Sequence, residues 1–479
     1  MNVAAIGFVL VVLPLVLLAL PDELISTIRT RLRWRLVAHP WATRIADWVL
    51  FLGLAIGSVL MSLDSVVVIG VTFGLSSAAQ TVVIAVLLMA AVFVVHAHLA
   101  EQGTAVTQLP RAALTMASLI IFGASGRDEP NLAPLVMPLV LLIGLPALVS
   151  THDAESRRRM LIVVMSAAFA FVCGGASAVL AESQILTRDP GLVRIALVLL
   201  LIHTGLISAA IPGHLWAHGM SESARLPGLA LLLGMGGLAG TMSLVSLVES
   251  YPWLPRVAGA RAVLIEFGSL SLVVALISLI GERRPARWVV SLSMMSAGIA
   301  WLTLASGSPN SISIGIIGLI DRSVGITVAL LGLGALSGFV AVGRLPALSQ
   351  RLIGHGGLAF WVGVATLIGL PMTTGFAARW LEIAALSNDR AQLALVVIVA
   401  MGISIAAAAR PAISLVVSPV LARTGDSGFS GSGTVDIDAV RQGRTGVVAL
   451  VLASGMVLFG LFPNALFEMI VIATSPLGN

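Results

Sequence analysis

Ionisable side chains lie inside or beside long apolar runs at many points of this sequence. Acids and histidines in such places can load and release a proton, and arginines can hold a carboxylate. A charge at the centre of a bilayer costs at least about 3 kcal/mol, so each such group needs a partner or a wet cavity. The simpler alternative for each is a position at the end of a span or a structural ion pair. These groups are Asp64, His96, His98, Glu182, Arg194, His203, Glu266, Asp321, Arg322, Arg379, Glu382, Arg410 and Glu468.

Two interruptions by proline and glycine single out part of this set. The first contains Pro212 and Gly213, and the second contains Pro371 and Gly375. Proline removes a backbone donor and glycine loosens a helix, so side chains or water must meet the freed carbonyls. Broken helices in two halves of a membrane protein point to an ion pathway between internal repeats. The two interruptions lie about 160 residues apart, which suits repeats of about five helices. A proline kink without a transport role is the alternative.

The histidines of the first interruption could suggest a metal site. His214 and His218 are spaced i, i+4, and Glu222 extends the same helix face. No third ligand follows at a recognised spacing. The sequence also has a single cysteine, Cys173, and no phosphate-binding loop, dinucleotide fingerprint or nucleophile elbow. We therefore predict no metal, no cofactor and no disulfide within this chain.

The composition predicts the elements that carry these residues. The chain has 479 residues, of which 58% are hydrophobic and only 10% charged, with a mean hydropathy of +1.06. A soluble domain carries about 25% charged residues, so this chain cannot cover a water-facing surface. The net charge of +5 gives no signal for nucleic acid. We predict an all-α polytopic membrane protein, a single transmembrane domain over 1–479.

Apolar runs between polar junctions predict about fourteen transmembrane helices, at roughly 20 residues each. The first run, Met1–Leu20, is interpreted as a retained helix because it lacks a basic region and a cleavage site. The spans run near 3–20, 46–63, 65–99 (whose division is open), 107–123, 132–150, 158–181, 191–211, 227–248, 259–281, 288–305, 312–343, 356–386, 391–420 and 445–470.

The arginines predict the orientation in the membrane. All 27 basic residues are arginines, and they concentrate at every second junction between spans. Basic junctions stay in the cytoplasm, so we expect an even helix count with both termini outside the cytoplasm. A polar loop at 421–444, rich in glycine and serine, is expected to be flexible and not catalytic.

Four short motifs carry a resemblance to a known family. PGHLW at 212–216 resembles a P-x-H-x-W motif at a helix break, and 282–306 resembles a basic turn followed by a serine-containing segment. The segments 321–336 and 369–380 resemble two further motifs, in the right order. The chain is thus similar to the antiporter-like membrane subunits of respiratory complex I (NADH–quinone oxidoreductase subunits N, M and L). Relatives occur in membrane-bound hydrogenases and multisubunit sodium/proton antiporters.

The resemblance implies an architecture and a set of partners. It implies a subunit of an energy-converting, proton-translocating complex in the bacterial inner (cytoplasmic) membrane. Other membrane subunits, the lipid bilayer, and protons or sodium would be its partners, and any quinone or NADH site would belong to those other subunits. It implies two inverted five-helix repeats at about 107–248 and 257–420, peripheral helices within 1–99 and 445–470, and discontinuous helices near 207–220 and 368–380.

This sequence departs from the family's proton path, which uses a glutamate and several lysines. The segment 134–144 has no acid, and 234–242, where a lysine is implied, is uncharged. Ile207 stands at another implied lysine position, and the nearest titratable group is His203, one helical turn earlier.

Other positions keep a charge of a different kind. Asp321 replaces an implied histidine, with Arg322 beside it, and Gly325 replaces a lysine. Arg379 replaces the lysine of the second interruption, with Glu382 at i+3. An arginine cannot release its proton in such a role. It can anchor a carboxylate or set the local electric field.

We therefore predict a retained scaffold with a degenerate lysine chain, and so a structural or weakly pumping subunit. One alternative is an active proton or cation translocator that uses a rearranged His/Asp/Glu path. A second is a polytopic membrane enzyme such as a lipid-linked glycosyltransferase. We expect substitution of Arg379 or His203 to leave assembly intact and to change ion flux little. The candidates for a proton or ion path are His203, His214, Asp321, Arg322, Arg379 and Glu382.

Overall fold

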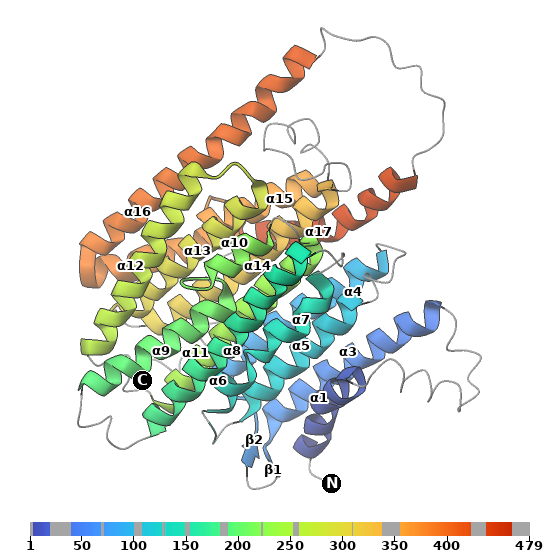
Figure 1. The fold of residues 1–479 in the computed structure, drawn as a ribbon, viewed down its shortest axis with the longest axis vertical. Coiled ribbons are helices and arrows are strands. Elements are labelled where there is room, and N and C mark those ends of the chain that lie inside the picture. Colours follow the sequence, from blue (N-terminus) through green and yellow to red (C-terminus); the bar gives the residue numbers. More distant parts are fainter. Residues whose placement is uncertain are drawn as a thin grey trace.

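The chain folds as long helices that run side by side along a common direction, with one short hairpin at an end of the bundle (Figure 1). The computed structural model describes residues 3–19, 40–68, 71–99, 108–126, 129, 131–148, 154–182, 190–221, 224–251, 258–308, 310–337, 355–422 and 437–461. The loop expected at 421–444 and the last residues of the span expected at 445–470 lie largely outside these ranges.

The helices follow one another along the chain without a larger sheet. They are α1 (Val3–Ala19), α3 (Pro40–Leu63), α4 (Ser77–Leu99), α5 (Gln108–Ser125), α6 (Leu132–Val136), α7 (Leu139–Leu148), α8 (Ala154–Glu182), α9 (Pro190–Ser208), α10 (His214–Met220), α11 (Leu226–Ser250), α12 (Ala258–Gly281), α13 (Pro285–Leu304), α14 (Ser311–Ser337), α15 (His355–Ile368), α16 (Thr374–Ala422) and α17 (Ile437–Leu461).

The helices are those of an integral membrane protein. Within the described ranges, nine helices are long and apolar enough to cross a membrane, and further apolar helices are shorter. Outer helices such as α8 and α12 expose large apolar side chains, among them Phe169 and Ile277, as a lipid-facing surface requires. The all-α polytopic prediction is confirmed, while the count of about fourteen spans stays a prediction.

Three helices form the centre of the bundle. Almost every side chain of α11 and α13 is buried, and α14 is buried along most of its length. An apolar helix in a membrane can face lipid or other helices, and these three are surrounded by other helices. Accordingly, α11 contacts α4, α7, α9 and α14, and α13 contacts α12, α14 and α16. Two of the charged residues that the sequence places inside spans, Asp321 and Arg322, lie in this centre, on α14.

The structure differs from the predicted spans in three places. The interval 65–99 holds an antiparallel hairpin, β1 (Val66–Val68) with β2 (Val71–Phe73), before a single helix, α4. The span near 132–150 is divided into α6 and α7. The spans near 356–386 and 391–420 share the long helix α16, which has a non-helical residue at Arg390 (φ −146°, ψ 82°). Short apolar runs do not separate strand from helix, which explains the first difference.

Both predicted helix interruptions are present. The first separates α9 from α10 at residues 209–213, and Ala209 there has a positive φ of 57°. The second separates α15 from α16 at residues 369–373, with positive φ at Gly369 (87°) and Met372 (69°). In each case the chain leaves the helix through a left-handed residue and restarts within a few residues, so each interruption is a true break.

Candidate functional site

An ion pair between Arg379 and Glu382 lies near the start of α16, just beyond the second break. Arg379 donates a hydrogen bond to Glu382, and their side chains are 1% and 0% exposed. Arg379 also donates to the hydroxyl of Ser296 on α13. The second carboxylate oxygen, Oε1 of Glu382, has no hydrogen-bond partner among the described residues. One oxygen of a buried acid is therefore left without a protein donor.

Two adjacent residues near the middle of α14 contact both breaks. Thr374, the first residue of α16, donates its hydroxyl proton to Oδ1 of Asp321 at 2.5 Å. Arg322 donates through Nε to the carbonyl of Ser293 at 2.8 Å, and through its other end to the carbonyl of Ser208. Ser208 is the last residue of α9. One helix thus connects the end of α9 with the start of α16.

The signs of these two charges suit the helix ends that they meet. A helix carries a partial positive charge at its N-terminus and a partial negative charge at its C-terminus. The carboxylate of Asp321 lies at the N-terminus of α16, and the guanidinium of Arg322 lies at the C-terminus of α9. Each break leaves backbone groups without helical partners. Arg322 bonds one of them, the carbonyl of Ser208, whereas Asp321 bonds the side-chain hydroxyl of Thr374.

We name Asp321, Arg322, Arg379 and Glu382 the central charge cluster. Arg379 interacts electrostatically with both Asp321 and Arg322, and Asp321 interacts with Glu382. With both acids ionised, the two positive and two negative charges cancel. A buried set of charges must be compensated in this way, because taking an isolated ion out of water is costly. Only the two carboxylates can readily exchange a proton, since arginine stays charged.

Glycines make room for the cluster. Gly369 combines its positive φ with a position at which an added Cβ would overlap the side chain of Arg379. Gly318 on α14 faces Glu382, and a Cβ there would overlap Oε1 of that residue. Both positions therefore favour glycine because a larger residue would collide with a side chain of the cluster, and Gly369 also because of its positive φ.

The first break is stabilised by a tryptophan. Nε1–H of Trp216 donates to the carbonyl of Leu206 at 2.7 Å, which meets a carbonyl near the end of α9. The ring of His214 lies edge-on to His218, with ring centres 6.0 Å apart. His218 is 3.2 Å from the hydroxyl of Ser291. The described residues contain no group of three His, Cys, Asp or Glu side chains that could hold a metal.

His203 is fully buried, and both its ring nitrogens have partners. Nδ1 lies 2.8 Å from the carbonyl of Ala170, and Nε2 lies 3.0 Å from the hydroxyl of Ser243. The geometry fits a neutral ring that donates from Nδ1 and accepts at Nε2. No described hydrogen bond joins His203 or His214 to the central charge cluster. Four of the six candidates therefore interact with one another, and the described hydrogen bonds of His203 go to other residues.

Several functional partners were not predicted. Ser208, Ser293, Ser296 and Thr374 contact the central charge cluster, and Ser243 contacts His203. A serine or threonine in an apolar helix usually bonds to its own backbone, so its type alone does not reveal a distant partner. Other charges within spans form pairs, as Arg194 does with Glu266 and His98 with Asp47.

Comparisons with known proteins first define the class. The sequence matches no protein-family model and no curated protein. Its fold, however, matches that of membrane subunits in solved complexes along almost the whole chain. The class is therefore a polytopic subunit fold of multisubunit membrane complexes.

Three solved structures give the particular likeness. A chain of the membrane-bound sulfane sulfur reductase, an archaeal respiratory membrane complex, has 15% identity and a TM-score of 0.73, with 100% of this chain and 98% of that chain covered. A chain of the Mrp complex from Dietzia sp. has 15% identity and a TM-score of 0.70, with the same coverage. A chain of respiratory complex I from Thermus thermophilus has 20% identity and a TM-score of 0.69, with 96% and 97% covered. The predicted resemblance to antiporter-like subunits is thereby confirmed for the fold.

Proposed function

We propose that this chain is an antiporter-like integral subunit of an energy-converting membrane complex of the complex I or Mrp type. The fold similarity supports the proposal, since it extends over nearly all of both chains. The observation that carries it is the central charge cluster, in which four charged residues are buried where two broken helices meet one helix of the centre. Discontinuous helices around buried charges are the usual construction of an ion-handling membrane protein.

Within that role we propose a structural or weakly pumping subunit. The segment 234–242 of α11, where a lysine was implied, is buried and uncharged, and Ile207 is fully buried. A proton would have to cross this region without a side chain that titrates. The arginines of the cluster hold backbone carbonyls and carboxylates in place, which is a structural task.

A second candidate function is an active proton or cation translocator with a rearranged path. It is favoured by one observation: Asp321 Oδ2 and Glu382 Oε1 both lack a hydrogen-bond partner among the described residues. A free carboxylate oxygen next to arginine can receive a proton or approach a cation. This candidate requires Asp321 and Glu382 to change protonation during turnover.

We also propose the placement that the sequence implied. The chain would lie in the bacterial inner membrane with both termini outside the cytoplasm, and its two halves, about 107–248 and 257–420, would be inverted repeats. The alternation of arginine-rich junctions supports the orientation. A break in each half, with positive φ at its first residue, supports the repeats.

Purification of the tagged full-length chain from its own membrane tests the subunit role. In a mild detergent, we expect it to elute as one species with other polytopic subunits in fixed stoichiometry. Deletion of the gene should remove that species. A chain that elutes alone, and that exchanges protons for cations by itself in liposomes, would contradict the subunit role and favour the second candidate.

A further inference from the structure

Two small cavities lie in line between the central charge cluster and one end of the bundle. The first, which we name the hydroxyl cavity, has a volume of about 10 Å³ and is lined in part by Thr204, Ser208 and Thr241. The second, which we name the apolar cavity, has a volume of about 20 Å³ and is lined only by aliphatic side chains. Its lining residues are Leu197, Leu200, Leu244, Leu247, Val248, Leu264, Leu304 and Ile312.

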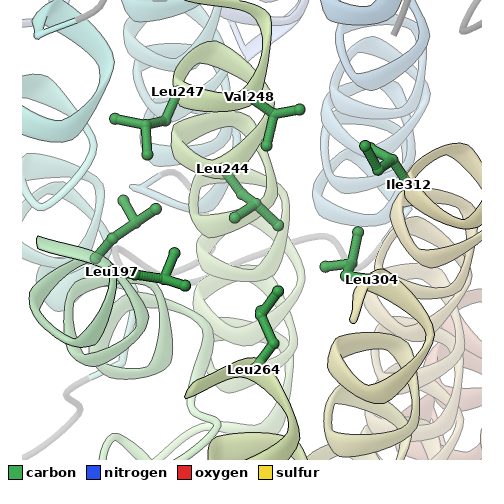
Figure 2. Close-up of a pocket in the computed structure, with 8 residues that line it drawn as sticks. Leu197, Leu244, Leu247, Val248, Leu264, Leu304 and Ile312 are labelled. Atoms are coloured by element: carbon green, nitrogen blue, oxygen red, sulfur yellow. The ribbon is translucent and has the colours of Figure 1, made fainter. Parts of the chain in front are cut away.

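The side chains of the apolar cavity come from five helices. Figure 2 shows Leu244, Leu247 and Val248 on one helix, α11, with Leu197, Leu264, Leu304 and Ile312 around them from neighbouring helices. Every one of the eight side chains is less than half exposed, and Leu200 and Leu247 are almost completely buried. Aliphatic side chains from the five helices therefore surround the cavity.

The two cavities follow the same order on several helices. On α9, Leu197 and Leu200 line the apolar cavity and Thr204 and Ser208 the hydroxyl cavity. On α14, Ile312 lines the apolar cavity, and Arg322 follows ten residues later, about 15 Å along a helix.

The remaining central helices repeat this order. On α11 the hydroxyl cavity is lined by Thr241 and the apolar cavity by Leu247, with Leu244 between them touching both. On α13, Trp301 lines the hydroxyl cavity and Leu304, the last residue of that helix, lines the apolar cavity.

The hydroxyl cavity adjoins the cluster directly. Ser208, which lines it, supplies the carbonyl that Arg322 binds. Gly237 also lines this cavity and lies close to the guanidinium of Arg322. A Cβ added at Gly237 would be 3.4 Å from Nη1 of Arg322. A cavity of this size with hydroxyl groups around it is near the lower limit for one water molecule.

We infer that the apolar cavity holds no water. Its aliphatic lining then forms a hydrophobic barrier, which we name the plug, between the hydrated surroundings of Arg322 and the membrane face where α9 begins and α11 ends. Apolar cavities stay empty of water even when they are several times larger, because water there finds no hydrogen-bond partner. Hydrophobic constrictions close channels in the same way, by excluding water. The plug would let the chain keep a charged centre without connecting it to that face.

The dryness of the cavity can be tested in the full-length chain with cysteine chemistry. The native Cys173 is first replaced by Ala, and Val248→Cys is then introduced into the lining. A charged, water-soluble methanethiosulfonate reacts with thiolates that water reaches. We expect Val248→Cys to react at least about a hundredfold more slowly than Gly281→Cys, an exposed position at the end of α12 with open space around it.

A matched pair of variants separates wetting from added space. Leu197→Ser with Leu200→Ser removes nearly the same volume as Leu197→Ala with Leu200→Ala but brings two hydroxyl groups. We expect the serine pair to raise the reactivity of Val248→Cys at least about tenfold, and the alanine pair to leave it low, because only a polar cavity holds water. Fast reaction in the otherwise unchanged chain, or equal reactivity of the serine and alanine pairs, overturns the plug.

The consequence of the plug for ion flux rests on the proposed function, whereas its dryness does not. Proton flux can be measured in proteoliposomes with an imposed pH gradient. If the serine pair conducts protons, and if adding Asp321→Asn with Glu382→Gln abolishes that flux, both the plug and a conducting cluster are supported. Raised thiol reactivity without flux supports the plug and a cluster that is structural. Flux through the serine pair without raised thiol reactivity would overturn the plug alone.

Discussion

At the scale of single residues, the central charge cluster explains what Arg379 does at a position where the resemblance to antiporter-like subunits implies lysine. A buried lysine serves because it can lose its proton, whereas arginine keeps its charge and offers several donors in a fixed plane. Arg322 uses these donors on two backbone carbonyls, and Arg379 uses them on Glu382 and Ser296. Both arginines therefore hold neighbouring groups in place.

This revises the expectation that Arg379 is dispensable for assembly. Arg379→Met leaves Glu382 buried without its partner, which costs about 3–5 kcal/mol when one member of a buried pair is removed. Arg379→Met with Glu382→Met removes both charges and should recover most of that loss. Thermal unfolding of the solubilised chain would show it. Equal destabilisation by the single and double variants would mean that the pair does not act as a unit.

His203 should respond differently. Its two ring nitrogens bond to Ala170 and Ser243, away from the cluster, so His203→Ala should lower stability and leave proton flux per assembled complex unchanged. Flux measured in membrane vesicles and divided by the amount of assembled complex gives the comparison. A large loss of flux in complexes that assemble normally would assign His203 a place on the path.

At the scale of elements, the two breaks depend on side chains from other helices. Trp216 donates a hydrogen bond to a carbonyl of α9, and Arg322 donates one to the last carbonyl of the same helix. Thr374, the first residue of α16, donates one to Asp321. Gly369 lets the chain turn beneath Arg379. These contacts hold the chain ends on both sides of the breaks, so we expect the breaks to be fixed features of the fold.

Two glycines, one in the second break and one in the interior of α16, test this rigidity. Gly369→Ala must adopt a positive φ and overlap Arg379, so we expect it to destabilise the chain by more than about 1 kcal/mol. Gly402→Ala, in the interior of α16 with open space around it, should be neutral or stabilising by about 1 kcal/mol. Melting temperatures of the two variants in the same detergent would decide. A neutral Gly369→Ala would show that the second break adapts.

The breaks were also the best predicted part of the structure. Pro212, Gly213, Pro371 and Gly375 mark them in the sequence because proline and glycine act on the backbone locally. The division of the span near 132–150 was missed, although Pro138 lies at the junction of α6 and α7. The partners of the charged residues could not be predicted, since Ser208 and Arg322 are 114 positions apart and come together only because α9 and α14 both pack against α11.

At the scale of the whole molecule, the proposed function combines a complete scaffold with an incomplete proton path. Its fold covers the full length of subunits from three kinds of membrane complex. Its centre holds a neutral set of four charges, and the positions between His203 and that set are apolar or hydroxyl-bearing. Under the proposed function, such a subunit would keep the shape that its neighbours contact without a continuous series of titratable groups among the described residues.

The measurement that tests this most directly is proton translocation by the intact complex carrying Asp321→Asn with Glu382→Gln. Both substitutions keep the size and hydrogen-bonding capacity of the side chains and remove their ability to ionise. Because the substitutions leave two buried arginines without counter-charges, we expect less complex to assemble. In the complex that does assemble, we expect translocation per turnover to fall by less than about twofold, because the cluster acts through its structure. A fall of more than about tenfold in a normally assembled complex would contradict this and identify the two carboxylates as carriers of the transported proton.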